Sequence, residues 1–148
     1  MTRSAKDATG RATKPIRPSI LVVDDEERIA DTLVLILKTK QYEAEAAYDA
    51  ASALEICSRR TPDLVISDVV MPGMNGIEMA VMIRSHFPSC RILLFSGQAA
   101  TADLLEEARH RGHEFELLAK PVHPETLLAK VNQLIHEPRS TVRPATRV

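Results

Sequence analysis

The sequence predicts an α/β fold in which a five-stranded parallel sheet carries helices on both faces, a doubly wound (βα)5 arrangement. Short aliphatic runs alternate five times with segments whose apolar residues recur at helical spacing, which is typical of βα units. Several of these runs have no polar interruption, as expected of parallel strands that are buried on both faces. The chain has 148 residues, 45% of them hydrophobic, which suits one compact domain and excludes wholesale disorder.

The five predicted strands are identified from these aliphatic runs. They span residues 20–23, 42–48, 64–67, 92–95 and 115–119. The run at 20–23 is continuous and partly β-branched, so both of its faces should be buried. The run at 42–48 alternates apolar and polar residues, which favours a strand at the edge of the sheet.

One helix is predicted after each strand, from apolar residues at helical spacing. The helical segments are residues 29–37, 50–59, 77–86, 104–108 and 124–135. Pro62 limits the second helix because it disfavours the helical conformation of the residue before it, and Pro88 stops the third. Pro124 stands at the favoured first position of the last helix.

Charge is distributed unevenly along a chain whose formal net charge is −1. Residues 1–18 contain five basic side chains and one acidic one, and residues 138–148 contain three basic and no acidic ones. Residues 19–137 contain 19 acidic and 11 basic side chains. We therefore expect an acidic folded domain over 19–137, a basic flexible N-terminal arm over 1–18 and a flexible C-terminal tail over 138–148.

Polar side chains stand at the carboxyl ends of four predicted strands, where open parallel sheets form their ligand-binding crevice. They are Asp24 and Asp25 after the first strand, Asp68 after the third, Ser96 after the fourth and Lys120 after the fifth. Clustered carboxylates repel one another and favour a divalent cation, and Mg²⁺ binds one or two carboxylates together with water and phosphate oxygens. A hydroxyl and an ammonium group can donate to the oxygens of a phosphoryl group at such a site. The sequence therefore predicts a Mg²⁺ and phosphoryl site at this edge.

Four motifs follow one another along the chain. Residues 20–26 read ILVVDDE, and residues 62–76 read PDLVISDVVMPGMNG. A Ser-Gly pair begins at residue 96 and a Lys-Pro pair at residue 120. Together, over residues 19–137, they resemble the receiver domain of two-component response regulators, in particular a stand-alone chemotaxis receiver. The resemblance implies a flavodoxin-like fold with strand order 2-1-3-4-5.

The resemblance also implies roles for the residues that handle the phosphoryl group. Asp68 would accept the group from a histidine kinase, and Lys120 would contact it. Ser96 would move toward it after phosphorylation. The peptide bond between Lys120 and Pro121 would be cis, which only an X-Pro bond adopts at a modest energy.

The same resemblance implies a set of Mg²⁺ ligands. Asp25 would bind the ion directly, and Asp24 directly or through water. Asp68 would bind it as well as accept the phosphoryl group. The backbone carbonyl of Val70 would supply a further ligand.

The implied function is a phosphorylation-dependent receiver in a two-component phosphorelay and not an enzyme, with only self-phosphorylation and self-dephosphorylation expected. The phosphoryl donor would be a histidine kinase or a histidine phosphotransfer protein. About a dozen residues follow the last predicted helix, so we expect no output domain, no DNA-binding module and signalling through a partner protein. No apolar run approaches the roughly 18 residues that span a bilayer. With two cysteines far apart in sequence, we expect a cytoplasmic protein without membrane insertion.

Other interpretations of the acidic residues stay open. Asp25 is also suited to cap the first helix. Enzymes of the haloacid-dehalogenase type also use an Asp at a strand end. The pattern of these enzymes has a second acid two residues later, and this chain has Val70 at that position. A flavodoxin-like mononucleotide binder requires a loop that accepts anions after the first strand, where this chain has acidic residues at 24–27. A receiver that binds partners without phosphorylation is a further alternative.

The residue three positions before Lys120 is Leu117. Many of the receivers that this sequence resembles have Tyr or Phe at that position. The nearest aromatic residue, Phe115, should lie on the same strand face by alternation. Because leucine has no polar tip, we expect its side chain to stay packed before and after phosphorylation. The response should instead fall on the loop after Ser96 and on the helix from about 102 to 111.

Overall fold

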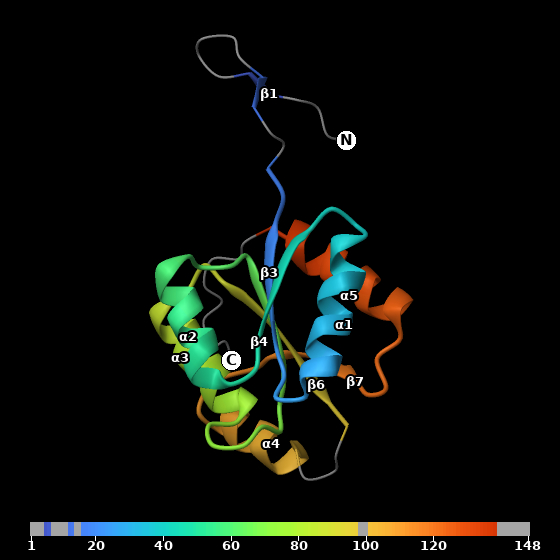
Figure 1. Cartoon of the computed structure of the whole chain (residues 1–148). Coiled ribbons are helices and arrows are strands. Elements are labelled where there is room, and N and C mark those ends of the chain that lie inside the picture. The colour runs from blue at the N-terminus through green and yellow to red at the C-terminus, as the bar shows by residue number, and fades with distance from the viewer. Residues whose placement is uncertain (1–4, 7–11, 14–15, 98–100, 139–148) are drawn as a thin grey trace.

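The computed structural model describes residues 5–6, 12–13, 16–97 and 101–138. Over these residues the chain forms a five-stranded parallel sheet with helices packed on both of its faces (Figure 1), and the predicted α/β architecture is confirmed. No helix in the described part of the chain is long and apolar enough to cross a membrane.

The sheet is built from short, parallel strands. They are β3 (Ser19–Val23), β4 (Glu43–Ala47), β5 (Leu64–Asp68), β6 (Arg91–Ser96) and β7 (Glu116–Ala119). Their order across the sheet is β4-β3-β5-β6-β7. Counted along the chain, this is the order 2-1-3-4-5 that the resemblance to receiver domains implied. β4 lies at one edge, as its alternating pattern predicted, and β7 lies at the other.

Five helices cover the sheet; the first four connect successive strands, and the fifth follows the last strand. They are α1 (Glu27–Lys38), α2 (Ala50–Arg59), α3 (Gly76–His86), α4 (Thr101–His110) and α5 (Pro124–His136). On one face, Leu37 of α1 and Leu127 of α5 share a buried cluster with Ile66 of β5. On the other face, residues of α2, α3 and α4 share a second cluster with Val65 of β5. Because side chains alternate along a strand, neighbouring residues of β5 supply both cores.

The last strand begins one residue later than predicted, so Phe115 precedes β7 and does not belong to it. The guanidinium carbon of Arg84 lies 4.2 Å from the centroid of the Phe115 ring. The His113 ring stacks on the same phenyl ring, with centroids 6.3 Å apart and an interplanar angle of 9°. Phe115 is therefore held between α3 and the turn that leads into β7.

The N-terminal flank contains a feature that the sequence analysis did not predict. Strands β1 (Ala5–Lys6) and β2 (Ala12–Thr13) pair in antiparallel fashion. The predicted flexibility of the arm over 1–18 and of the tail over 138–148 concerns residues that lie largely outside the described part of the chain, and it stays a prediction.

Candidate functional site

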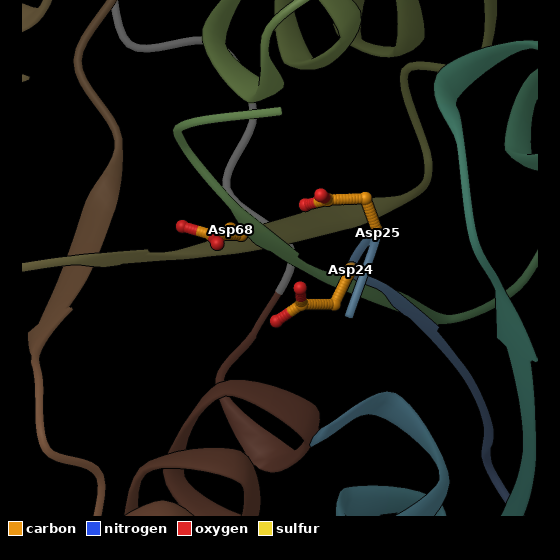
Figure 2. Close-up of side chains that lie close together, drawn as sticks. All are labelled: Asp24, Asp25 and Asp68. Carbon is orange, nitrogen blue, oxygen red and sulfur yellow. The ribbon is translucent and has the colours of Figure 1, made fainter. Parts of the chain in front are cut away.

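The three aspartates predicted to bind Mg²⁺ come together at the carboxyl ends of two neighbouring strands. Asp24 and Asp25 directly follow β3, and Asp68 is the last residue of β5, which pairs with β3. One carboxylate oxygen of each aspartate lies within 4.8 Å of the other two. Figure 2 shows the three side chains extending from these strand ends to the same side. Three negative charges this close repel one another unless a cation offsets them.

Asp24 is the most deeply buried member of this acidic cluster. Its Oδ1 accepts a hydrogen bond from the backbone N–H of Glu26 at 2.9 Å, whereas its Oδ2 is buried without a hydrogen-bond partner among the described residues. Burial raises the pKa of the Asp24 carboxyl above its usual range, and the negative charges of Asp68 and Asp25 raise it further. A divalent cation would give Oδ2 a partner and offset the repulsion. The cluster of hard carboxylate oxygens therefore fits Mg²⁺.

Asp25 does not cap the first helix. Helix α1 begins at Glu27, its N-cap position is Glu26, and no side chain accepts a capping hydrogen bond there. Asp25 is exposed, and its carboxylate belongs to the acidic cluster. The capping interpretation is therefore wrong.

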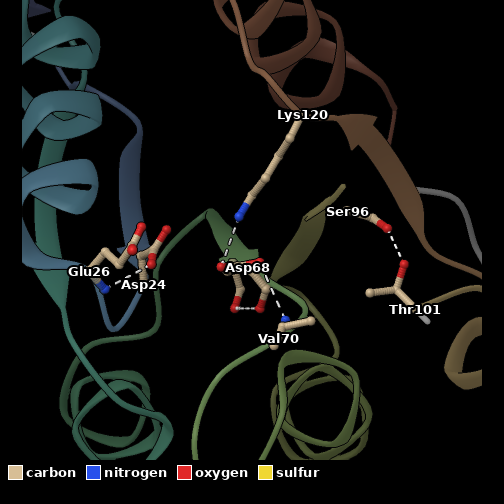
Figure 3. A network of polar contacts seen from close by, with 8 residues as sticks. Asp24, Glu26, Asp68, Val70, Ser96, Thr101 and Lys120 are labelled. Carbon is tan, nitrogen blue, oxygen red and sulfur yellow. Dashed lines mark hydrogen bonds and ion pairs between the residues drawn. The ribbon is translucent and has the colours of Figure 1, made fainter. Parts of the chain in front are cut away.

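Both carboxylate oxygens of Asp68 have partners (Figure 3). Oδ2 lies 3.0 Å from Nζ of Lys120, and Oδ1 accepts a hydrogen bond from the backbone N–H of Val70 at 3.3 Å. Lys120 directly follows β7, which β6 separates from β5, so its side chain reaches across the end of the sheet to Asp68. The ammonium group places a positive charge beside the carboxylate predicted to be modified.

Two glycines make room for this arrangement. A Cβ atom on Gly97 would lie 2.8 Å from Cβ of Lys120, so a side chain at that position would displace the lysine. A Cβ atom on Gly76 would lie 2.0 Å from the backbone oxygen of Asp68, which no real contact reaches. Helix α3 can therefore begin against the end of β5 only because residue 76 is a glycine.

A capping box fixes the start of α3 beside Asp68. The Asn75 side chain accepts a hydrogen bond from the Glu78 backbone N–H at 2.8 Å, and the Glu78 side chain accepts one from the Asn75 backbone N–H at 3.0 Å. These bonds satisfy two N–H groups that the first turn of a helix leaves unpaired. The loop between β5 and α3 is thus fixed at the end that enters α3.

The Ser96 hydroxyl forms a hydrogen bond with the hydroxyl of Thr101. Figure 3 shows the Ser96 side chain directed toward Thr101 and away from Asp68. Thr101 is the first residue of α4 and is buried. Thr101 could not be identified from the sequence, because a hydroxyl pair depends on side-chain rotamers that no periodicity encodes. The available signal was a second hydroxyl residue soon after Ser96.

The backbone around Lys120 agrees with what the resemblance to receiver domains implies. The Lys120-Pro121 peptide bond is cis, as implied. The Lys120 backbone N–H donates to the Ser96 carbonyl oxygen at 3.2 Å, which continues the pairing of β6 with β7. The Val70 N–H binds Asp68, while the role of the Val70 carbonyl as a metal ligand stays a prediction.

The expectation that Leu117 is packed is wrong for this structure. The Leu117 side chain is 40% exposed, and no residue of β7 is fully buried. β7 is an edge strand, and its inward residue Leu118 packs with the cluster on the α1 and α5 side. Leu117 points to the opposite face by alternation, and that face is poorly covered at this edge.

Comparison with known proteins agrees with this geometry. Residues 20–132 match the family described as the response regulator receiver domain. The DNA-binding response regulator MtrA of Mycolicibacterium paratuberculosis is 29% identical over 116 residues, which are 78% of this chain and 50% of that protein. The chain thus spans about half the length of the curated relatives it matches.

Solved structures show the same fold. The signal receiver domain of an HD domain-containing protein from Pseudomonas fluorescens is 32% identical, with a TM-score of 0.74 over 81% of this chain and 95% of that one. The response regulator TrrA from Thermotoga maritima, solved in complex with Mg²⁺-BeF, is 32% identical, with a TM-score of 0.69 over 79% of this chain and 98% of that one. The family match covers most of the chain and includes every residue of the predicted site. The chain therefore belongs to the response regulator receiver domain family.

Proposed function

We propose that Asp68 accepts a phosphoryl group from the phosphorylated histidine of a kinase or a phosphotransfer protein. The observation that carries the proposal is the position of the Asp68 carboxylate, which lies 3.0 Å from Lys120 Nζ and within 4.8 Å of Asp24 and Asp25 oxygens. One carboxylate thus has a cation on one side and a set of possible metal ligands on the other. Such an arrangement favours an incoming phosphoryl group, whose negative charge both sides can offset.

In the proposed reaction an oxygen of Asp68 attacks the phosphorus atom. An O–P bond forms and the P–N bond to the donor imidazole breaks, with its electron pair staying on the imidazole nitrogen. Lys120 lies close enough to donate to a phosphoryl oxygen once the group is on Asp68. Mg²⁺ bound by Asp24, Asp25 and Asp68 would supply further positive charge to the phosphoryl oxygens. The Val70 N–H holds the Asp68 carboxylate in place during the transfer.

Phosphorylation by a small donor tests this assignment. The parent protein, incubated with acetyl phosphate and Mg²⁺, should gain one phosphoryl group in intact-mass spectrometry, and Asp68→Asn should gain none. Asn has nearly the same shape but no negative oxygen to attack phosphorus. Equal labelling of Asp68→Asn would show that the acceptor is elsewhere.

Mg²⁺ binding is tested separately with Asp25→Asn. Asp25 is exposed, so its replacement should leave the fold intact while weakening Mg²⁺ binding by roughly tenfold or more. Asp103→Asn removes an exposed carboxylate from α4, outside the acidic cluster, and serves as the matched control. Equal Mg²⁺ affinity of Asp25→Asn and Asp103→Asn would contradict the proposed ligand set.

We also propose that the phosphorylated form signals to a partner protein instead of turning over as a phosphatase. Val70 occupies the position where a dehalogenase-like enzyme has its second acid, and its exposed aliphatic side chain cannot act as a general acid. Hydrolysis of p-nitrophenyl phosphate by the parent protein should therefore equal that by Asp68→Asn. Turnover that depends on Asp68 would favour the enzyme.

A further inference from the structure

We infer that Thr101 is a positioning residue, which holds the Ser96 hydroxyl away from Asp68 until Asp68 is phosphorylated and thereby couples the site to α4. The inference rests on the proposed function, because it requires a phosphoryl group on Asp68. It gives Thr101, the first residue of α4, a role that is separate from those of the acidic cluster and Lys120.

Ser96 and Thr101 contact each other through their side-chain hydroxyls. The Ser96 hydroxyl and the Thr101 hydroxyl are hydrogen-bonded, and the Ser96 side chain is directed away from Asp68 (Figure 3). Thr101 is 2% exposed, so water does not compete freely for its side chain. A hydrogen bond in such surroundings stabilises one Ser96 rotamer over the others.

The backbone of Ser96 is held by its pairing with β7, which leaves its side chain as the part that can respond. Ser96 ends β6 and pairs in register with Ala119 of β7, and its carbonyl oxygen accepts the Lys120 N–H at 3.2 Å. The same Lys120 binds Asp68. Contact of the Ser96 hydroxyl with a phosphoryl group on Asp68 therefore requires a rotation about its side-chain bond, and that rotation breaks the bond to Thr101.

Thr101 is also one of few anchors of α4. Among the residues of α4, only Thr101 and Ala108 are buried, whereas α3 buries five residues. A change at Thr101 therefore acts on the end of a helix that few other contacts hold. Release of Ser96 from Thr101 thus links the phosphorylated site to the first turn of α4.

Thr101→Val and Thr101→Ser form the test. Valine keeps the shape of threonine but removes the hydroxyl, so Ser96 loses the partner that competes with the phosphoryl group. Titration of Mg²⁺ and beryllofluoride, a mimic of the phosphoryl group, should reach its midpoint at a roughly twofold to tenfold lower concentration in Thr101→Val, the range expected from one hydrogen bond. Thr101→Ser keeps the hydroxyl and should restore the parent midpoint. Thr39→Val removes a threonine hydroxyl that binds a backbone carbonyl at the end of α1, and it should leave the midpoint unchanged.

Amide hydrogen exchange measures a response that is not expected if Thr101 has only a structural role. In the parent protein, beryllofluoride should increase exchange at the amides of residues 105–108, whose N–H groups bond to the carbonyls of the first turn of α4. Thr101→Val should show this increase without beryllofluoride. The parent measurement tests the inference even where Thr101→Val folds poorly, because unchanged exchange at these amides in the saturated parent would overturn it.

The outcomes separate the two proposals. Beryllofluoride binding that is equal in the parent and in Asp68→Asn would contradict the assignment of Asp68 as the phosphoryl acceptor. Binding that depends on Asp68, with a Thr101→Val midpoint equal to or above that of the parent, would leave the acceptor in place and overturn the role of Thr101. A lowered midpoint shared by Thr101→Val and Thr101→Ser would also overturn it, since it would show that the hydroxyl is not responsible.

Discussion

The centre of the sheet and its β7 edge differ sharply in how well they are packed. All five residues of β5 are buried, and α3 beside it buries five of its residues. At the edge, β7 has no fully buried residue and α4 buries two. Local opening is easiest where few apolar contacts hold a segment. The proposed acceptor Asp68 therefore stands on the rigid part. Ser96 ends the neighbouring strand β6, while Lys120 and Thr101 belong to the edge, where structural change requires the least energy.

Gly76→Ala should have the largest effect on stability, because its new side-chain atom would overlap with the backbone of Asp68 in the rigid centre. The new Cβ would lie 2.0 Å from the Asp68 backbone oxygen, and neither backbone can move without separating α3 from β5. We expect a loss of more than about 3 kcal/mol in the free energy of unfolding, measured by urea denaturation. Gly73→Ala is the matched control, since its φ of 74° causes strain of about 1–2 kcal/mol but its Cβ would contact nothing within 4 Å. A smaller loss for Gly76→Ala than for Gly73→Ala would show that the centre is more adaptable than its packing indicates.

Leu94→Ala and Leu117→Ala compare the two regions at a single register pair. Leu94 of β6 and Leu117 of β7 are partners in the sheet, but Leu94 is fully buried and Leu117 is 40% exposed. Leu94→Ala should lower the free energy of unfolding by about 2–5 kcal/mol, because it leaves a cavity in the core. Leu117→Ala should lower it by less than about 1 kcal/mol, because water already reaches the side chain. Equal losses in urea denaturation would mean that the β7 edge is as tightly packed as the centre.

Gly97→Ala acts at the boundary between the two regions and should affect chemistry more than stability. Its Cβ would lie 2.8 Å from Cβ of Lys120 and would move the lysine away from Asp68. We expect labelling by acetyl phosphate to slow by roughly tenfold, a loss of charge stabilisation smaller than complete removal of a donor. In a Lys120→Ala background the same change should have little further effect, because the displaced group is already gone. A full tenfold slowing in that background would show that Gly97→Ala does not act by displacing the Lys120 ammonium group.

The rigid centre was the part that sequence analysis could predict. A buried parallel strand is a continuous aliphatic run, and its carboxyl end is the residue where that run stops, so Asp24, Asp25 and Asp68 were identified from the pattern alone. Parallel strands bring their carboxyl ends to one edge, which explains why these residues meet in the structure. The strand order came from the resemblance to receiver domains, because alternation of strands and helices does not determine which strands are neighbours.

The edge was the part that sequence analysis predicted poorly. The exposure of Leu117 depends on what covers an edge strand, which the strand's own residues do not encode. The bond between Ser96 and Thr101 depends on rotamers, and the position of Phe115 depends on Arg84 from α3. Each of these contacts joins segments whose relative placement is a product of tertiary packing. Local patterns therefore identify the proposed acceptor but not the residues proposed to respond to it.

The pH dependence of stability should give the smallest effect, and it examines the contact between α3 and the turn that leads into β7. The His113 ring stacks on Phe115, and its Nδ1 is buried without a hydrogen-bond partner among the described residues. Burial lowers the pKa of His113 below its usual value, and the positive charges of Arg84 and Arg111 lower it further. Arg84 is held in place by its bond to the Glu114 carbonyl oxygen at 2.9 Å, so it cannot easily move away from a charged imidazole.

The sign of this effect follows from the lowered pKa. The folded protein binds the proton less readily than the unfolded chain does, so the stability from neutral His113 is fully present above about pH 6.5 and decreases as the pH falls below it. Urea midpoints measured between pH 7.5 and 5.5 should therefore decrease more in the parent protein than in His113→Asn, which has no ionisable ring. The same slope in both proteins would mean that the imidazole can be protonated without disturbing Phe115 and Arg84. In that case the edge would be held to α3 less tightly than the stacked rings and the Arg84 contact indicate.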